Sequence, residues 1–171
     1  MPNLDNPLRL EIQKRLTAAL EEITITNGYL FDLTGNVHRG RMAYGHETPL
    51  PALSILEPPI PMDQLPPPAT STTQSGPWEL IIQGFVKDDR ENPTDPAHVL
   101  MADVKRRLAS ERAKANWDRP EEGILGLGRN VLNLYIGTGV VRPPDDVSAV
   151  AYFWVQIMLD LAEDIAEPYT A

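Results

Sequence analysis

Gly76-Pro-Trp-Glu-Leu-Ile-Ile-Gln-Gly-Phe-Val86 is the stretch of this chain from which the fold can be worked out. Aromatic and β-branched residues dominate it, and turn formers bound it at Gly76-Pro77 and Asn92-Pro93, so it predicts a strand. Successive side chains of a strand point to opposite faces, and here both sets are apolar: Trp78, Leu80, Ile82 and Val86 on one face, Ile81 and Phe85 on the other. We therefore expect both faces of the sheet to be covered.

A helix is expected directly after this strand. Thr94-Asp95-Pro96 is typical of a helix start, because a carboxylate can cap free N–H groups and proline has no N–H to leave unpaired. Apolar residues then recur at helical spacing up to Leu108, and cations collect toward Arg112, where they suit the helix dipole. The pattern predicts a strand and a helix that packs on it.

The rest of the chain predicts one more helix and further strands. Asn6-Pro7 opens a helix whose apolar stripe runs from Leu8 to Ile23. Strands are expected at Val37–Tyr44, Pro51–Glu57, Val131–Ile136 with a continuation at Val140-Val141, and Ala149–Leu161. The last segment also fits helical spacing, but we prefer a strand because aromatic and β-branched residues dominate it. Strands joined by turns predict an α+β two-layer fold, with a mostly antiparallel sheet of four or five strands and two helices on one face.

Composition indicates a single domain without disulfide or metal cross-links. The chain has 171 residues, no cysteine and a net charge of −9, from 24 acidic and 15 basic side chains. The missing cysteines exclude disulfides and thiolate chemistry, and the acidity argues against broad affinity for nucleic acid. Because the start lacks a signal-peptide pattern and the longest apolar stretch is too short to span a bilayer of about 30 Å, we expect a soluble, intracellular protein.

A proline-rich segment at 57–77 interrupts the domain. It contains seven prolines, followed by Thr, Ser and Gln residues, so it supplies nothing to a core. One interpretation is a solvated, polyproline-like linker. The other is a loop that a neighbouring molecule orders, which would be a weak indication of an assembly.

Catalytic patterns are sparse. Asp88, Asp89 and Glu91, with Asp95 and His98 nearby, could be imagined around a divalent metal in a nuclease, but their spacing does not match a calcium loop, and a solvated turn with a helix cap explains them better. No Gly-Lys-Ser/Thr follows the glycines of Gly123–Gly128, and no nucleophile pattern occurs. We expect no enzyme activity, no metal and no cofactor.

The histidines and several arginines are most simply interpreted as surface residues. The three histidines lie in separate segments without metal spacing, and the basic residues could meet phosphate or acids of a partner, although a solvated strand face explains them better. These residues are His38, His46 and His98, and Arg39, Arg41 and Arg129.

The order of the segments suggests a family. The helix Leu8–Ile23 is followed by Val37-His-Arg-Gly-Arg41, Pro49-Leu-Pro-Ala-Leu-Ser-Ile-Leu-Glu57, Trp78-Glu-Leu-Ile-Ile-Gln-Gly84, and Asn92-Pro-Thr-Asp-Pro-Ala-His98 leading to Asp103-Val-Lys105. Over most of the chain, from about residue 6 to residue 160, this order resembles the tail terminator, or tail completion, proteins of long-tailed bacteriophages.

The resemblance implies a homohexameric ring on the end of the tail tube that stops tube polymerisation and docks to the head–tail connector protein. Its partners would be further copies of itself, the tail tube protein and the connector; DNA would pass through the lumen without specific binding, and no membrane would be involved. The protein would be assembled in the host cytoplasm and reside in the virion, at the neck-proximal end of the tail. A head-to-tail adaptor is the alternative within the same particle, and a metal-dependent nuclease using Asp88, Asp89 and Glu91 is the alternative of another class.

The doubly apolar strands supply candidates for a subunit interface. Two helices can cover only one face of such a sheet, so the other face should lie against another chain. The candidates are Ile81, Phe85, Tyr152 and Trp154, and, on the opposite face of the last strand, Phe153 and Val155.

Overall fold

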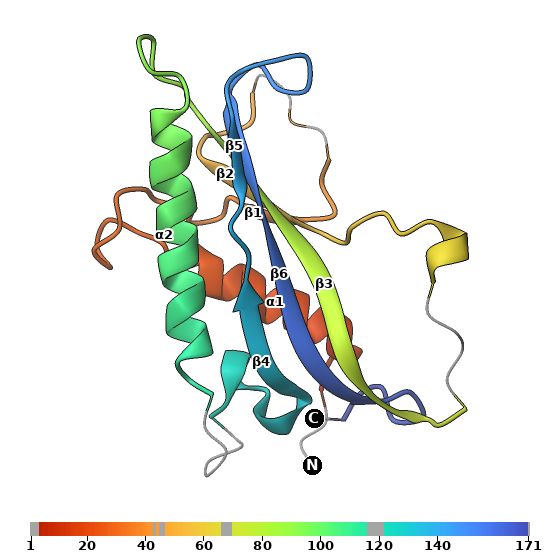
Figure 1. Cartoon of the computed structure of the whole chain (residues 1–171). Coiled ribbons are helices and arrows are strands. Elements are labelled where there is room, and N and C mark those ends of the chain that lie inside the picture. Colours follow the sequence, from red (N-terminus) through yellow and green to blue (C-terminus); the bar gives the residue numbers. More distant parts are fainter. Residues whose placement is uncertain (1–3, 43, 45–46, 66–69, 116–121, 171) are drawn as a thin grey trace.

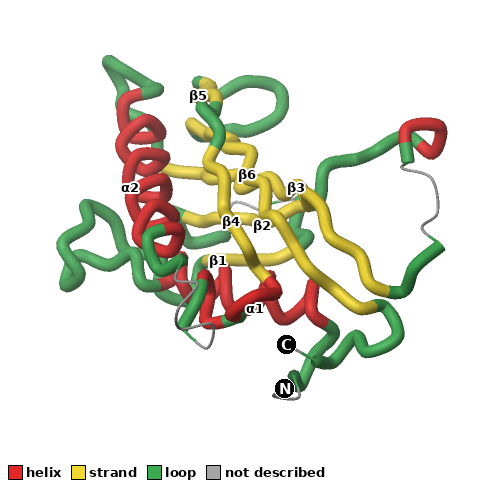
Figure 2. Tube along the Cα trace, turned by 60° about the horizontal axis from the view of Figure 1, so that its bottom comes forward, coloured by secondary structure: helices red, strands yellow, loops and turns green. Residues whose placement is uncertain are grey.

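The computed structural model describes residues 4–42, 44, 47–65, 70–115 and 122–170, which form two layers (Figure 1). One layer is a six-stranded sheet. The other consists of two helices, α1 (Leu8–Glu21) and α2 (Asp95–Arg112). Helix α2 runs roughly along the strands, whereas α1 runs across them (Figure 2). Within the described residues, neither helix is long and apolar enough to cross a membrane.

Two long strands form the centre of the sheet. They are β3 (Thr73–Val86) and β6 (Ala151–Asp164), which pair antiparallel over all their 14 residues. The shorter strands flank this pair in the order β1-β2-β3-β6-β4, and β5 also pairs with β6. These strands are β1 (Val37–Arg39), β2 (Ala52–Leu56), β4 (Val131–Ile136) and β5 (Val140–Arg142). Short 3₁₀ turns occur at Met62–Gln64, Ile124–Gly126 and Gly128–Asn130.

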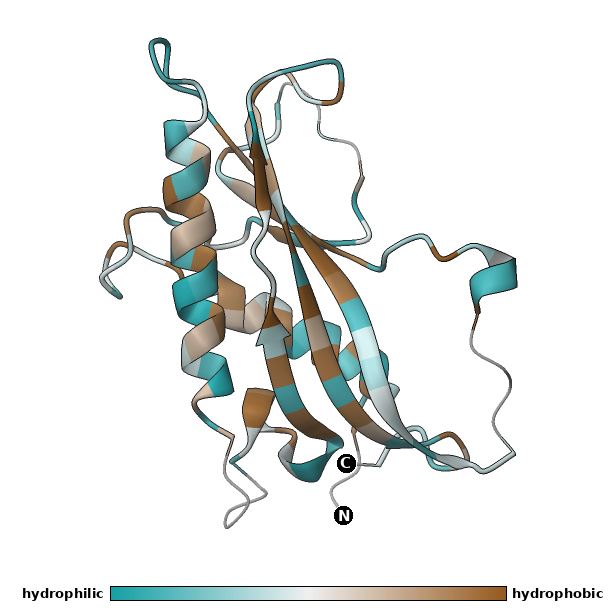
Figure 3. Cartoon of the chain, viewed as in Figure 1, coloured by the Kyte–Doolittle hydropathy of each residue, from teal (hydrophilic) through white to brown (hydrophobic). Residues whose placement is uncertain are grey.

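The core lies between the helices and one face of the sheet. From β3 and β6 it takes alternate residues, among them Leu80, Ile82, Phe153 and Val155, and all four are buried. The apolar faces of α1 and α2 cover them, and Figure 3 shows hydrophobic residues along the central strands. The alternation therefore divides each central strand into a face under the helices and an open face.

Gly84 makes room for the largest core side chain. It pairs with Phe153 across the strands, and a Cβ atom on Gly84 would overlap the Phe153 ring and lie 2.9 Å from Leu53 Cδ2. The ring therefore packs over bare backbone. This close approach is a typical reason for a glycine inside a strand.

A buried ionic cluster joins the helices to each other. Arg107 of α2 donates to the Ala19 carbonyl oxygen of α1 over 2.9 Å and pairs with Glu111 over 2.7 Å. Glu111 also accepts from Lys114 over 2.6 Å and from the backbone N–H of Leu125. Burial raises the pKa of Glu111, but the hydrogen bonds from Lys114 and Arg107 outweigh this effect and hold it below its ordinary value.

The predicted fold class is confirmed: the protein is α+β, and its helices pack against a mostly antiparallel sheet. The strand Val131–Ile136 has the expected bounds, and the strand preferred at Ala149–Leu161 forms as Ala151–Asp164. Helix α2 begins at Asp95 as expected, but no side-chain hydrogen bond caps it.

Three details of the prediction were wrong. The sheet has six strands, because the continuation at Val140 forms a separate strand on β6. Strands β1 and β2 are parallel, since the chain between them returns to the end where β1 began. Strand β3 begins at Thr73, inside the segment assigned to the proline-rich loop, because β6 extends to Asp164 and pairs with these polar residues.

We expect Gly84→Ala to destabilise the fold by roughly 1 to 3 kcal/mol, the cost of overpacking a tight core. The added methyl group must push the Phe153 ring out of its position. Urea unfolding would measure the loss. Gly35→Ala is a control for steric overlap, because nothing lies near a Cβ there; any loss at Gly35 would reflect its positive φ alone. A Gly84→Ala protein as stable as the wild type would contradict this packing.

We expect Glu111→Gln to lower the free energy of unfolding at pH 7 by roughly 1.5 to 3 kcal/mol, the range for hydrogen bonds to charged groups. Because the pKa of Glu111 is lowered in the fold, its stabilisation is present above its ordinary value of 4.5 and is lost as the pH falls through the folded-state pKa. The difference between variant and wild type should therefore shrink in urea titrations below pH 4.5.

The control for Glu111 is Glu163→Gln, which removes the ion pair with Arg9 at the surface. It should cost less than about 1 kcal/mol, because exposed ion pairs contribute little. Equal losses for both variants at neutral pH would contradict the structural role of the buried cluster.

Candidate interaction surface

The open face of the sheet, opposite the helices, carries apolar side chains in its middle. The register places Trp154 of β6 between Gln83 of β3 and Val140 of β5. Trp154 is 37% exposed and Val140 is exposed as well. Ile81 lies one step further along β3 on the same face and is half-buried. The open face thus carries the apolar group Trp154, Val140 and Ile81 beside polar residues such as Gln83 and the exposed Gln156, whereas a fully solvated face would be polar throughout.

Five aromatic rings follow one another across this face. The ring centroids of His38 and Tyr44 are 6.1 Å apart, those of Tyr44 and Phe85 4.4 Å, those of Phe85 and Tyr152 6.2 Å, and those of Tyr152 and Trp154 5.9 Å. These spacings fall in the range of favourable aromatic pairs. We call these five residues the aromatic row.

Hydrogen bonds and a cation fix the two tyrosines of the row. The hydroxyl group of Tyr44 donates to the Leu53 carbonyl oxygen over 3.2 Å, and the Arg41 guanidinium lies 4.7 Å from the Tyr44 ring centroid. The hydroxyl group of Tyr152 donates to Asp145 over 2.9 Å. Burial raises the pKa of both tyrosines, and the bond to Asp145 raises that of Tyr152 further. Both phenols therefore remain neutral donors.

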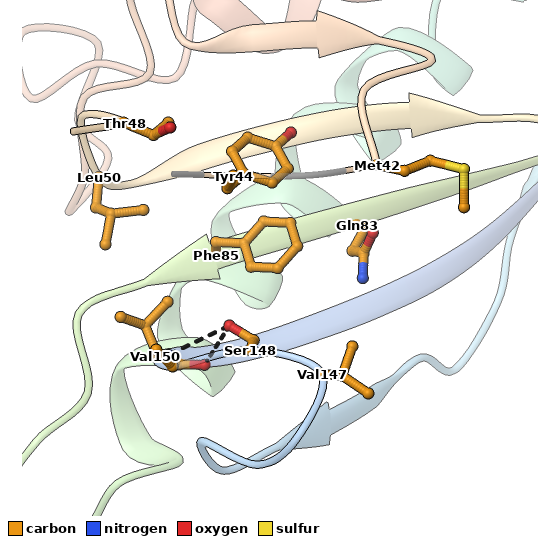
Figure 4. Close-up of a pocket in the computed structure, with 10 residues that line it drawn as sticks. Met42, Tyr44, Thr48, Leu50, Gln83, Phe85, Val147, Ser148 and Val150 are labelled. Carbon is orange, nitrogen blue, oxygen red and sulfur yellow. Dashed lines mark hydrogen bonds between the residues drawn. The ribbon is translucent and has the colours of Figure 1, made fainter. Parts of the chain in front are cut away.

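A groove of about 380 Å³ lies beside the Tyr44 and Phe85 rings of the row (Figure 4). Its walls come from the loop before β2, from β3 and from the segment before β6, and we call it the aromatic groove. It is lined by Met42, Tyr44, Thr48, Leu50, Gln83, Phe85 and residues 147–150. Figure 4 shows the Tyr44 and Phe85 rings next to each other. The lining is mostly apolar, with Gln83 among its polar groups, as in sites that bind organic ligands or peptides.

The predicted interface residues fall into two groups. Ile81 and Trp154 reach the surface of the open face, while Phe85 and Tyr152 belong to the same face but are buried in the aromatic row. Phe153 and Val155 lie in the core under the helices with no exposed surface. As components of the core, these two are not available to contact another chain, because their side chains alternate to the helix side.

Sequence reasoning missed the contribution of two loops. Tyr44, Leu50 and Val147 line the groove, and Val140 pairs with Trp154, but none of them was selected from the sequence. The apolar character of Val147 between acidic residues and serine was the available signal. Nothing in the sequence indicated that the loops before β2 and β6 meet over Phe85.

Two of the residues considered for metal or phosphate binding, Asp89 and Arg39, take part in local hydrogen bonds. Asp89 accepts the backbone N–H groups of Glu91 and Asn92 over 2.8 and 2.7 Å, which lowers its pKa and closes the turn before α2. Among the residues that the structure describes, no three His, Asp or Glu side chains gather as a metal site would require. Arg39 donates to Thr17 of α1.

The remaining candidates are spread over the molecule. His38 is part of the aromatic row, His98 is exposed on α2, and Arg129 is exposed in a 3₁₀ turn. His46 lies outside the described residues. The structure therefore brings together only His38 and Arg41 among the described basic candidates, at 3.3 Å between Nε2 and Nη1.

A scan against models of known protein families and a search of curated proteins both give no match to this chain.

We expect Trp154→Asp to abolish self-association while the fold survives. Trp154 lies on the open face and already meets solvent, so the unfolding free energy should fall by no more than about 1 to 2 kcal/mol. Circular dichroism would report the fold, and light scattering after gel filtration the oligomer mass.

Trp78→Asp is the matched control, because Trp78 lies on the same strand pair but in the core and should unfold the protein when replaced. Normal oligomers of Trp154→Asp, or a chain unfolded at every concentration, would contradict the assignment of Trp154 to an interface.

Proposed function

We propose that this protein is a structural assembly subunit, a tail terminator that forms a ring on the end of a bacteriophage tail tube. The observation that carries the proposal is the open sheet face, on which Trp154, the last ring of the aromatic row, and Val140 are exposed beside the buried Tyr152. In a monomer these exposed apolar side chains contribute no free energy of burial. Fully burying one large apolar side chain contributes roughly 1.5 to 3 kcal/mol. A second protein surface is the natural cover for it.

The fold supports the proposal. The resemblance to tail terminators implies a small two-layer domain with helices and sheet, and the chain has this architecture. The segment order on which the resemblance rests corresponds to α1, β1, β2, β3 and α2 in succession. Because the helices occupy one face of the sheet, the opposite face is available to neighbouring subunits.

The proposed partners follow from the same assignment. Copies of the chain would form a hexameric ring, one side of which contacts the tail tube protein and the other the head–tail connector protein. The net charge of −9 suits a lumen through which DNA slides, since an acidic surface repels phosphate. In this proposal the protein is not an enzyme, binds no membrane, and resides at the neck-proximal end of the tail.

The test is a tube-growth assay with the cognate tail tube protein. We expect the purified chain to limit tube length in electron micrographs and to appear as a ring on one tube end, with native mass spectrometry giving the number of copies. A stable monomer that leaves tube length unchanged would overturn the proposal. A ring that binds only the connector and does not stop tube growth would instead assign the protein as a head-to-tail adaptor.

A further inference from the structure

The proline-rich segment stands away from the body of the molecule. We call residues 57–65 the arm; it contains Pro58, Pro59 and Pro61 and leaves the sheet at the end of β2 (Figures 1 and 2). A hydrogen bond of 3.3 Å from Gln13 of α1 to Glu57 holds its base. Beyond the base, the described side chains from Pro59 to Leu65 are exposed. The arm is therefore anchored to the domain at its start and faces solvent along the rest.

Pro61 and Leu65, which flank the 3₁₀ turn of the arm, have polyproline II dihedral angles. Pro61 has φ −56° and ψ 143°, and Leu65 has φ −62° and ψ 137°. Two apolar side chains project from this backbone, Ile60 at 51% exposure and Leu65 at 52%. Within the arm, the Pro61 carbonyl oxygen accepts from the backbone N–H of Gln64 over 2.9 Å, so donors of a partner would have to reach carbonyl groups outside the 3₁₀ turn.

The aromatic groove has the chemistry that recognises such a segment. Polyproline II ligands bind in grooves lined by aromatic side chains, where proline rings pack on aromatic faces and side-chain donors reach the peptide carbonyls. The groove offers the rings of Tyr44 and Phe85, the amide of Gln83, and, beside Gln83 in the sheet, the exposed Trp154.

Charge contributes little to the fit of the two elements. The arm carries Glu57 and Asp63, of which Asp63 is exposed near the tip. Arg142 of β5 lies directly opposite Tyr152 and its side chain is 51% exposed, but it already pairs with Asp145 over 3.6 Å. An acidic arm in the groove would compete with Asp145 for Arg142, so apolar packing must supply most of the contact.

The arm and the groove of one chain lie at opposite ends of β2. Strand β2 begins at Ala52, opposite Phe85 of the groove, and ends at Leu56, opposite Ile81, where the arm departs. The chain then returns at Thr73, still further from the groove along β3. The arm of one molecule therefore extends away from its own groove.

We propose that the arm of one copy of this chain docks in the aromatic groove of the next copy. The contact joins two different surfaces, so it is heterologous and repeats head to tail until the ring closes. Each subunit gives one arm and receives one, which also covers part of the open face next to Trp154. This inference deepens the proposed function and rests on the self-association that it requires.

Two variants test the two sides of the contact separately. The arm variant, Ile60→Asp with Leu65→Asp, changes only exposed side chains, and the groove variant, Val147→Asp, changes a loop residue that is 73% exposed. Ile25→Asp is the matched control, since Ile25 is 69% exposed but follows α1 and lies in neither surface. All three should fold like the wild type, as circular dichroism would show.

Mass measurement of each protein and of their mixture gives the decisive result. The wild type and Ile25→Asp should form rings, whereas the arm variant and the groove variant should each be monomers. An equimolar mixture of the two variants retains one intact contact, from the arm of the groove variant to the groove of the arm variant, so it should form a dimer of one copy each and nothing larger. A mixture that stays monomeric, or an arm variant that forms wild-type rings, would overturn the inference.

Disulfide trapping gives a second measurement, because the chain has no cysteine of its own. A single Leu65→Cys protein mixed with a single Val147→Cys protein should yield an oxidised heterodimer, and Leu65→Cys mixed with Ile25→Cys should not.

Rings that survive in the arm variant overturn the arm contact but leave the terminator proposal intact. A wild type that is monomeric both alone and with tail tubes overturns both.

Discussion

The pairing of β3 with β6 is the interaction on which the rest of the structure depends. It joins residues 73–86 to residues 151–164 without a break in register, and it brings together parts of the chain that are far apart in sequence. A slip of one residue would send every side chain to the other face of the sheet. The packing of Phe153 over Gly84 opposes such a slip, because only glycine leaves room for the ring. Core and open face are thereby defined together.

The arrangement of side chains on the open face follows from this pairing. Phe85, Tyr152, Gln83 and Trp154 occupy neighbouring positions because β3 and β6 place them there, and the loops before β2 and β6 then close over Phe85 to form the groove. The helices contribute nothing to this side. Their role is to bury the opposite face, which the ionic cluster around Glu111 supports by joining α1 to α2. The side chains of the surface proposed for assembly are therefore different from those of the core, although the same strand pairing places both sets.

The sequence predicted the elements whose apolar side chains alternate or repeat clearly. It failed for segments whose conformation is determined by the strand they pair with. Apolar alternation identified Trp78–Val86 and the last strand, and helical spacing identified α2. Thr73–Pro77 has no apolar alternation and becomes a strand only because β6 offers it backbone partners. The parallel pairing of β1 with β2 and the meeting of Tyr44 with Phe85 depend on the path of a loop, which residue patterns do not encode. Candidate interface residues were selected by hydrophobicity, but which of two adjacent residues faces outward needed the position of the helices.

Energetics explain why an assembly of this chain would need more than one apolar contact. Association costs roughly 4 to 15 kcal/mol in lost motion, and a large side chain that goes from exposed to fully buried returns about 1.5 to 3 kcal/mol. Trp154 returns less, because only 37% of it is exposed. The net charge of −9 adds repulsion between copies. An arm in which Pro58, Pro59 and Pro61 fix their φ angles loses less entropy on docking than a flexible loop would. In a closed ring every subunit makes two such contacts, so that breaking one leaves the subunit held by the other, and individually modest contacts can then sustain a stable assembly.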